Sequence, residues 1–265
     1  MNYLQEIRQE ISQGQQHQYP FSVAATKISG PLRFATPVTF FVGENGSGKS
    51  TILEALAAAI DLPTIGGDSI RYDDTLVYAR QLAKCMRLTW NQKSQRGFFL
   101  RSEDFFNFSR RMANMARELA EDAAYYEESL SGYGLQLAKG SALAQRDAIV
   151  RKYGENLDAN SHGEAVMHLL LQRIVPEGLY LMDEPETPFS PSRQLALLSL
   201  IKQTSEREGC QFVIATHSPI LLALPDATIY SFDHSPLSTV GFEDLEHVNL
   251  TRDFLNNPGA FLRHL

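Results

Sequence analysis

The sequence has few cysteines and no long apolar segment. Its two cysteines, Cys85 and Cys210, lie far apart and lack metal-ligand spacing, so neither a disulfide framework nor a cysteine-bound zinc site is expected. No apolar run approaches the ~20 residues that a membrane helix needs, and the opening residues contain no apolar signal core. These absences predict a soluble, cytoplasmic protein that is not inserted in a membrane.

Positive charge is also scarce. The chain has 24 Lys and Arg residues against 31 Asp and Glu residues, a formal net charge of -7, and such a field does not favour binding to nucleic acid or to an anionic membrane. Arginines interleaved with phenylalanines occur between residues 96 and 117, a pattern that can bind single strands. Acidic neighbours dilute that charge and aromatics at this spacing are typical of a core. Nucleic acid is therefore an open alternative that the charge does not indicate.

The most informative segment is residues 43–51, Gly-Glu-Asn-Gly-Ser-Gly-Lys-Ser-Thr, which has the pattern of a phosphate-binding loop. It follows a strand-like run and precedes a helix-like run whose N-terminus would face the phosphates. Glycines let backbone N–H groups turn toward phosphate oxygens, the lysine adds a point charge, and the serine hydroxyl can ligate Mg²⁺. The predicted nucleotide contacts are Gly43, Asn45, Gly46, Ser47, Gly48, Lys49, Ser50 and Thr51, with Lys49 also assisting catalysis.

Two later strand-like runs end in groups that complete such a site. One ends in Asp183 and Glu184, and the next ends at His217. The carboxyl ends of parallel strands meet at the sheet edge where nucleotides bind. Asp183 is therefore expected to hold Mg²⁺ together with Ser50. Glu184 is expected to polarise the attacking water, and His217 to hydrogen-bond the γ-phosphate or that water. A solvated strand end and a structural histidine are the alternatives.

With these motifs in this order, the chain resembles ABC-type ATPases of the stand-alone kind often labelled "AAA family ATPase". It is similar to the nucleotide-binding heads of chromosome-maintenance and recombination-repair ATPases. In that family, residues 43–51 correspond to Walker A and residues 179–183 to Walker B. Glu184 corresponds to the catalytic glutamate and His217 to the switch histidine.

The resemblance implies an α/β fold, a P-loop NTPase of ABC type. Such a fold has a mixed or parallel central sheet, N-terminal antiparallel strands and an inserted helical subdomain. It further implies a single ATPase domain over residues 1–265, with the helical subdomain at about 100–175, and ATP and Mg²⁺ as cofactors.

The family's head-to-tail dimer uses a signature sequence, usually Leu-Ser-Gly-Gly-Gln, before the Walker B strand. Residues 160–164, Asn-Ser-His-Gly-Glu, occupy that place. Ser161 and Gly163 match the residues that in the family grip the γ-phosphate held by the partner, whereas His162 and Glu164 depart from the pattern. An ordinary helix N-cap at Ser161 is the alternative. The resemblance thus implies an ATP-dependent homodimer.

Other family features are matched only in part. Tyr19 and Phe21 lie where an aromatic ring stacks on adenine, although either residue fits a strand core equally well. A Q-loop glutamine does not follow the strand-like run 97–100, so no Q-loop residue is assigned. Residues 105–130 have helical propensity, but heptads are not sustained, which predicts that the long coiled-coil arm of chromosome-maintenance heads is absent.

The hypothesis from sequence is a Mg-dependent ATPase that hydrolyses ATP to ADP and phosphate and whose ATP-bound dimer is a molecular switch. One alternative is an ATP-switched module for DNA repair or phage defence, which the acidic charge disfavours. A second is the nucleotide-binding subunit of a transporter, which the altered signature and the missing glutamine disfavour. A third is a small-molecule phosphotransferase, which the signature and switch histidine disfavour. An unidentified protein partner is compatible with the hypothesis.

Overall fold

A six-stranded sheet forms the centre of the computed structural model, which describes residues 2–11, 19–22, 30–65, 70–153, 162–233 and 236–263. Its first five strands are parallel and the last pairs antiparallel. In spatial order the strands are β5 (Gly97–Leu100), β6 (Leu179–Asp183), β7 (Gln211–Ala215), β3 (Val38–Val42), β8 (Thr228–Ser231) and β9 (Ser238–Thr239).

A second, antiparallel sheet is built mainly from the N-terminal segment. It contains β2 (Leu32–Arg33), β1 (Leu4–Gln9) and β4 (Met86–Trp90) in that order. The predicted combination of a mixed central sheet with N-terminal antiparallel strands is therefore confirmed.

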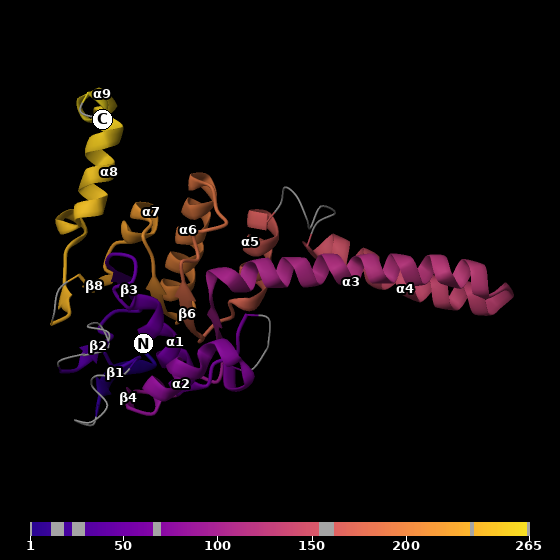
Figure 1. The fold of residues 1–265 in the computed structure, drawn as a ribbon, viewed down its shortest axis with the longest axis horizontal. Coiled ribbons are helices and arrows are strands. Elements are labelled where there is room, and N and C mark those ends of the chain that lie inside the picture. The colour runs from indigo at the N-terminus through magenta and orange to yellow at the C-terminus, as the bar shows by residue number, and fades with distance from the viewer. Residues whose placement is uncertain are drawn as a thin grey trace.

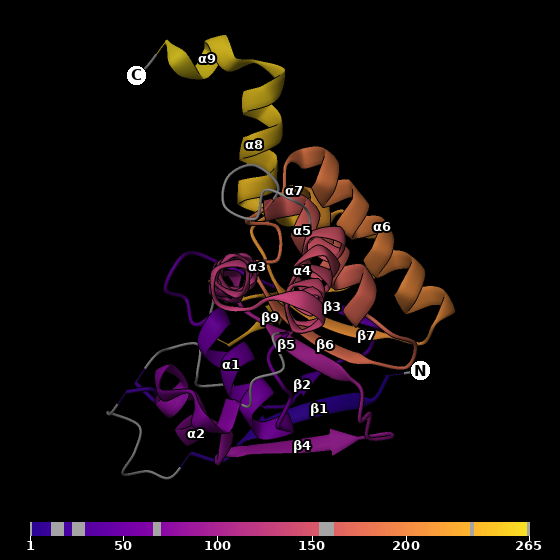
Figure 2. The same ribbon diagram turned by 90° about the vertical axis from the view of Figure 1, so that its right-hand side faces the viewer.

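Helices cover both faces of the central sheet (Figure 2). One face carries α1 (Lys49–Ile60) and α2 (Val77–Ala83), beside the antiparallel sheet, and the other carries α5 (His162–Arg173) and α6 (Pro191–Arg207). Short helical segments link these elements: the 3-10 turns Ile70–Tyr72, Asp74–Leu76 and Phe242–Asp244, and α7 (Pro219–Leu222).

The core has two parts because successive strand residues point to opposite faces of a sheet. Phe40, Tyr180 and Phe212 pack with α5 and α6 on one face. Their neighbours Phe41 and Leu181 pack with α1 and β1 on the other. The central strands are buried on both sides, which explains why they are continuous apolar runs in the sequence.

Two long helices, α3 (Ser102–Ser129) and α4 (Gly132–Tyr153), lie side by side and project from the body as an arm (Figure 1). A helix of 28 residues spans about 42 Å. The sequence predicted only that the long coiled-coil arm of chromosome-maintenance heads is absent, and it did not indicate this shorter arm. Among the described residues, the buried positions of the arm are alanines, Ala116, Ala123 and Ala142, and larger side chains such as Leu119 and Tyr126 are half-buried.

The C-terminal segment forms α8 (Glu246–Asn256) and α9 (Pro258–Leu262), which extend away from the sheet (Figures 1 and 2). Pro258 is the first residue of α9 and separates the two helices. Within the described residues, none of the helices is long and apolar enough to cross a bilayer.

Candidate nucleotide and magnesium site

The segments that carry the predicted site residues follow three neighbouring strands of the central sheet, and these strands end at the same height. Phe41 of β3 and Asp183 of β6 are both in register with Ala215 of β7. Because these three strands are parallel, the loops that follow them leave the sheet side by side. The segments containing Gly43, Glu184 and His217 are thereby brought to the same edge.

The loop after β3 has the backbone that a phosphate site requires. Gly43 has φ 147°, in the region that favours glycine, and a Cβ there would lie 3.0 Å from Asp233 Oδ1 and 3.0 Å from Ser47 Oγ. The backbone N–H of Glu44 donates to Asp233 Oδ1 over 2.7 Å. Asp233 therefore anchors the start of the loop, a contact that sequence analysis missed.

Lys49 is buried inside the loop that it closes. Its Nζ donates to the carbonyl oxygens of Gly43 at 2.7 Å and Glu44 at 3.0 Å. Burial lowers the pKa of Lys49, and the carboxylates of Glu184 and Asp183 oppose that shift. The ammonium group thus lies among backbone oxygens and two acids.

The remaining loop residues leave donors available for an anion. The hydroxyl of Ser47 is buried and has no hydrogen-bond partner in the described part of the chain. Ser50 and Thr51 are in the first turn of α1, and Gly46 and Gly48 also have positive φ. Asn45 is exposed. A helix N-terminus of this kind presents N–H groups and a positive dipole end to a phosphate.

The donor set beside the loop fits Mg²⁺. The side chains of Ser50 and Asp183 are hydrogen-bonded, and burial raises the pKa of Asp183 to about 6. Asp183 Oδ1 is buried and, among the described residues, unpartnered. Carboxylate and hydroxyl oxygens suit this hard cation, which completes its shell with phosphates and water. Within the described ranges, no group of three or more His, Cys, Asp or Glu side chains is arranged to hold a metal ion by itself, so this pair is the protein's candidate contribution.

Glu184 and His217 face each other at the end of β6 and β7. Their closest atoms, Glu184 Oε1 and His217 Nε2, are 3.9 Å apart. Burial and the charge of Lys49 lower the pKa of His217, although Glu184 opposes the shift. The imidazole is therefore neutral near pH 7 and the contact is not an ion pair. Glu184 has φ 46°, an uncommon value for a residue with a side chain that often marks a functional position.

Glu186 holds the segment that carries the histidine, and the sequence did not reveal this. Its Oε1 accepts the hydroxyl of Thr216 at 2.6 Å and the backbone N–H of His217 at 2.9 Å. Burial raises the pKa of Glu186, and the two donated hydrogen bonds oppose that shift. Glu186 is thus a positioning residue between the loops after β6 and β7.

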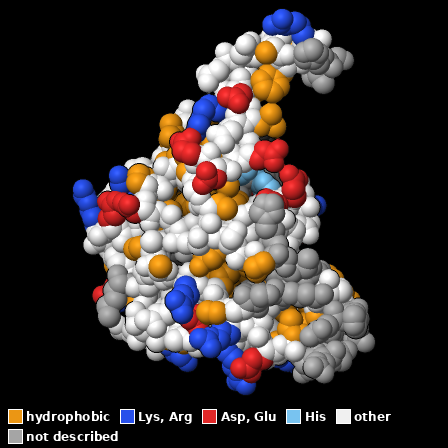
Figure 3. Space-filling view, turned by 90° about the vertical axis from the view of Figure 1, so that its left-hand side faces the viewer, with side chains coloured by type: hydrophobic (Ala, Val, Ile, Leu, Met, Phe, Trp, Pro, Cys, Tyr) orange, Lys and Arg blue, Asp and Glu red, His pale blue; other side chains and the backbone are white. Residues whose placement is uncertain are grey.

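A pocket of about 740 Å³ opens beside residues 43–47. Its other walls come from the loop after β7, the end of β8 and the start of α8. Figure 3 shows this side of the molecule, on which an exposed histidine (pale blue) lies among acidic side chains (red) below the C-terminal helices. The titratable residues that line it are Glu44, His217, Asp233, Asp244, Glu246 and His247.

The described part of the signature segment begins at His162, so Ser161 lies outside the described residues. Gly163 is buried in the first turn of α5, and a Cβ there would lie 2.7 Å from the carbonyl oxygen of Pro188. Packing therefore explains this glycine independently of any phosphate. Its predicted contact with a partner's nucleotide stays a prediction.

The two aromatic candidates for adenine stacking differ in exposure. Phe21 is buried in the core with β1 and α1. Tyr19 is half exposed and packs edge-on against Tyr78, with ring centroids 4.7 Å apart. The core alternative holds for Phe21, and stacking by Tyr19 stays a prediction.

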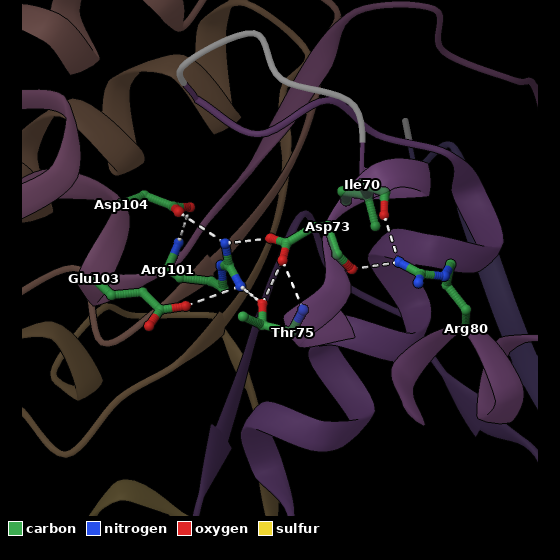
Figure 4. Close-up of polar contacts among 7 residues, drawn as sticks. All are labelled: Ile70, Asp73, Thr75, Arg80, Arg101, Glu103 and Asp104. Atoms are coloured by element: carbon green, nitrogen blue, oxygen red, sulfur yellow. Dashed lines mark hydrogen bonds and ion pairs between the residues drawn. The ribbon is translucent and has the colours of Figure 1, made fainter. Parts of the chain in front are cut away.

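The position after β5, where ABC-type ATPases usually have the Q-loop glutamine, is occupied by a buried arginine (Figure 4). Arg101 pairs with Asp73 at 2.8 Å and Asp104 at 3.1 Å, and donates to Thr75 Oγ1 at 3.0 Å. Asp104 also accepts the backbone N–H of Arg101. These bonds join the start of the arm to the turn before α2, so Arg101 has a structural role.

The arginines and phenylalanines whose pattern is compatible with single-strand binding lie in different parts of the structure. Phe98 and Phe99 are core residues of β5, and Arg96 lies 3.7 Å from Glu177. Arg101 belongs to the buried network, while Arg117 is exposed on α3 beside Glu121. The core reading of these two phenylalanines is therefore correct.

Comparisons with known proteins agree with the motifs. Residues 27–141 match a family described as "AAA domain", and residues 165–223 match one described as "AAA domain, putative AbiEii toxin, Type IV TA system". The petrobactin import ATP-binding protein YclP of Bacillus subtilis is 27% identical over 68% of this chain and 66% of its own length. The hemin import ATP-binding protein HmuV of Burkholderia thailandensis is 29% identical over 70% of each chain.

Among solved structures, the Smc head domain of Pyrococcus furiosus, bound to the C-terminal domain of ScpA, matches with a TM-score of 0.46 and 12% identity. That match covers 95% of this chain and 99% of the Smc chain. The matched regions of the two import proteins amount to about two thirds of their lengths. By its motifs, its sheet order and its sequence relatives, this chain resembles the ATP-binding proteins of the ABC type and carries their P-loop fold.

Proposed function

We propose that this protein binds ATP with Mg²⁺ and hydrolyses it to ADP and phosphate. The observation that carries the proposal is the convergence of Lys49, Asp183, Glu184 and His217 on one sheet edge. Phosphoryl transfer needs little covalent chemistry from the protein, so positioning and charge account for most of the catalysis. A site with these four groups supplies both.

Each group has a distinct role in the proposed reaction. The loop amides and Lys49 bind the phosphates, and Ser50 and Asp183 hold the metal ion, which neutralises developing charge on the phosphate oxygens. Glu184 accepts a proton from the attacking water. His217, neutral and with Nε2 free of described partners, donates to the terminal phosphate.

Magnesium dependence is the first test. Phosphate release by the parent protein should require Mg²⁺ and should stop when the metal is chelated. Asp183→Asn should need a higher Mg²⁺ concentration for half-maximal rate, because it removes the ionised metal ligand. A parent rate that is the same with and without Mg²⁺ contradicts this part of the proposal.

We further propose that two copies associate head to tail around ATP and separate after hydrolysis. The proposal is supported by the match of Ser161 and Gly163 to the family signature, which acts on a partner's nucleotide. A ligand shifts such an equilibrium only as far as its affinities for the two states differ. ATP would favour the dimer, and ADP the monomer.

Light scattering after size-exclusion chromatography tests the dimer. Glu184→Gln, which should bind ATP without turning it over, is expected to double its mass with Mg-ATP and to remain monomeric with ADP. Adding Ser161→Arg should abolish that dimer by placing a bulky cation at the contact. A monomer under every condition contradicts the switch while leaving ATP hydrolysis untouched.

A second candidate function is the ATP-binding subunit of an importer. The similarity to two import ATP-binding proteins favours it, whereas the burial of Arg101 at the Q-loop position disfavours it. Affinity purification from gently solubilised cells distinguishes the two. Stoichiometric recovery of one membrane protein would favour the transporter role, and recovery of the chain alone would favour the switch.

A further inference from the structure

The C-terminal helix α8 places a second histidine in the pocket beside the phosphate-binding loop. His247 is the second residue of α8, and the nearby Leu245 and Val248 are buried in the core. These two anchors fix the start of the helix, so that His247 lines the pocket. The ring centroids of His247 and His217 lie 6.4 Å apart.

His247 carries a polar atom that the described protein does not use. Its Nε2 is buried and has no hydrogen-bond partner among the described residues, and the same holds for Nε2 of His217. Burying such an atom without a partner costs free energy. Two of them at one pocket therefore indicate a ligand with several acceptor oxygens.

Residues 43–47 of the predicted phosphate-binding loop form another wall of the same pocket, and a phosphate is a ligand that such a loop binds through its backbone N–H groups. A hydrogen bond from an imidazole N–H to a phosphate oxygen is about 2.9 Å long. Two rings that donate to different oxygens of one phosphate must therefore stand several ångströms apart. The observed separation of 6.4 Å agrees with this arrangement.

We propose that His247 contacts the terminal phosphate of the bound nucleoside triphosphate beside His217, so that α8 distinguishes the triphosphate from the diphosphate. The inference rests on the proposed nucleotide site at residues 43–51. It adds a second phosphate contact from the C-terminal helix, and it links nucleotide state to the segment that extends away from the sheet.

The charges around His247 give the contact a measurable signature. Burial lowers the pKa of His247, Lys49 lowers it further, and Asp233 and Glu44 oppose the shift. The ring is therefore neutral near pH 7, and a triphosphate, by adding negative charge, should raise its pKa and cause proton uptake. The charged groups facing it come from the loop, α1, the end of β7, the end of β8 and its own segment: Glu44, Lys49, His217, Asp233, Asp244 and Glu246.

Titration calorimetry with the non-hydrolysable AMPPNP and with ADP, both with Mg²⁺, tests the inference in two buffers of different ionisation enthalpy. His247→Ala should weaken AMPPNP binding about tenfold, as expected for a lost hydrogen bond to a charged group, with ADP affinity unchanged. Proton uptake on AMPPNP binding should fall. His247→Gln, which keeps an amide donor, should retain AMPPNP affinity within about threefold but lose the same proton uptake.

His168→Ala is the matched control, because this histidine is exposed on α5, and it should leave both nucleotides unaffected. The inference is overturned if His247→Ala binds AMPPNP as tightly as the parent, or if it weakens AMPPNP and ADP equally. A folded parent protein that binds neither nucleotide overturns the proposed function itself, and this inference with it.

Discussion

Thr216 donates its hydroxyl to Glu186 Oε1 over 2.6 Å, which ties the end of β7 to the loop after β6. The same oxygen accepts the backbone N–H of His217. One carboxylate therefore fixes the segment carrying the histidine relative to the segment carrying Glu184. This contact makes Glu186 the support on which the geometry of the candidate site depends.

Removing that support should impair turnover more than nucleotide binding. Glu186→Ala leaves a partly buried N–H without its acceptor, at a cost of about 1–3 kcal/mol in the free energy of unfolding, and frees His217 to move. We expect phosphate release to fall about tenfold and the Tm to drop by several degrees. Glu186→Gln keeps an acceptor oxygen and should restore both. Turnover by Glu186→Ala at the parent rate would rule out the positioning role.

Asp183 should make the nucleotide-free protein less stable as pH rises. Its pKa is about 6 in the folded state against 3.8 for the unperturbed group, so between these values the folded state binds more protons than the unfolded state. Stability is then lost as pH rises from about 4 through 6, by up to about 3 kcal/mol. Asp183→Asn should raise the Tm at pH 8 and change it little at pH 4. Equal shifts at both pH values would contradict the assignment.

Glu54 of α1 reinforces that pH dependence. Burial raises its pKa to about 7, and the charge of Asp183 contributes to the shift. The raised value again means that stability declines as pH rises, here from the unperturbed 4.5 through about 7. Compared with the parent protein, Glu54→Gln should therefore raise the Tm more at pH 8 than at pH 4. No difference between the two pH values would show that Glu54 is solvated.

Gly163 should tolerate no side chain, whatever its role in a dimer. A Cβ there meets the backbone carbonyl of Pro188 at 2.7 Å, so Gly163→Ala must displace α5 from the loop before α6. We expect a loss of about 1–3 kcal/mol in the free energy of unfolding, as for other overpacked sites. Gly134→Ala is the control, since a Cβ there meets no described atom within 4 Å and alanine favours the helix. Chemical denaturation should separate the two variants; equal stability would contradict the packing argument.

Arg101 should contribute to stability through charge pairing. Arg101→Met leaves Asp73 and Asp104 without their cation, and breaking a buried pair in this way costs about 3–5 kcal/mol. Arg117→Met removes an exposed arginine from α3, the helix that Arg101 precedes, and should cost less than about 1 kcal/mol. Thermal unfolding of both variants checks this. Similar Tm values would show that the Arg101 network adds nothing.

The parts of the fold that sequence reasoning found are those with a local signal. The strands β3, β6 and β7 are short, mostly apolar runs. Because β6 and β7 lead directly into the polar groups of Asp183 and His217, their buried position and common edge could both be inferred. The phosphate-binding pattern at 43–51 is defined by the spacing of its own glycines, lysine and serine, so it can be recognised without reference to distant residues. The candidate site residues could therefore be proposed without knowledge of strand order.

The parts that were missed depend on contacts between distant segments. The most buried positions of the arm are alanines such as Ala116 and Ala142, which give only a weak hydrophobic signal in the sequence. Glu186 acts on residues about 30 positions later, and this relation exists only because β6 and β7 are neighbours. His247 lies near the loop because Leu245 and Val248 bury the start of α8 in the core. The local sequence does not indicate that this helix starts beside residues 43–47.

The most direct test of the central claim compares ATP binding and phosphate release for the parent and Glu184→Gln in the same preparation. We expect the two proteins to bind Mg-ATP with similar affinity, while phosphate release by Glu184→Gln falls at least about a hundredfold, the lower range for a lost general base. Equal rates of phosphate release would contradict the account, because the water would then be activated by a group other than the one that the fold places beside His217.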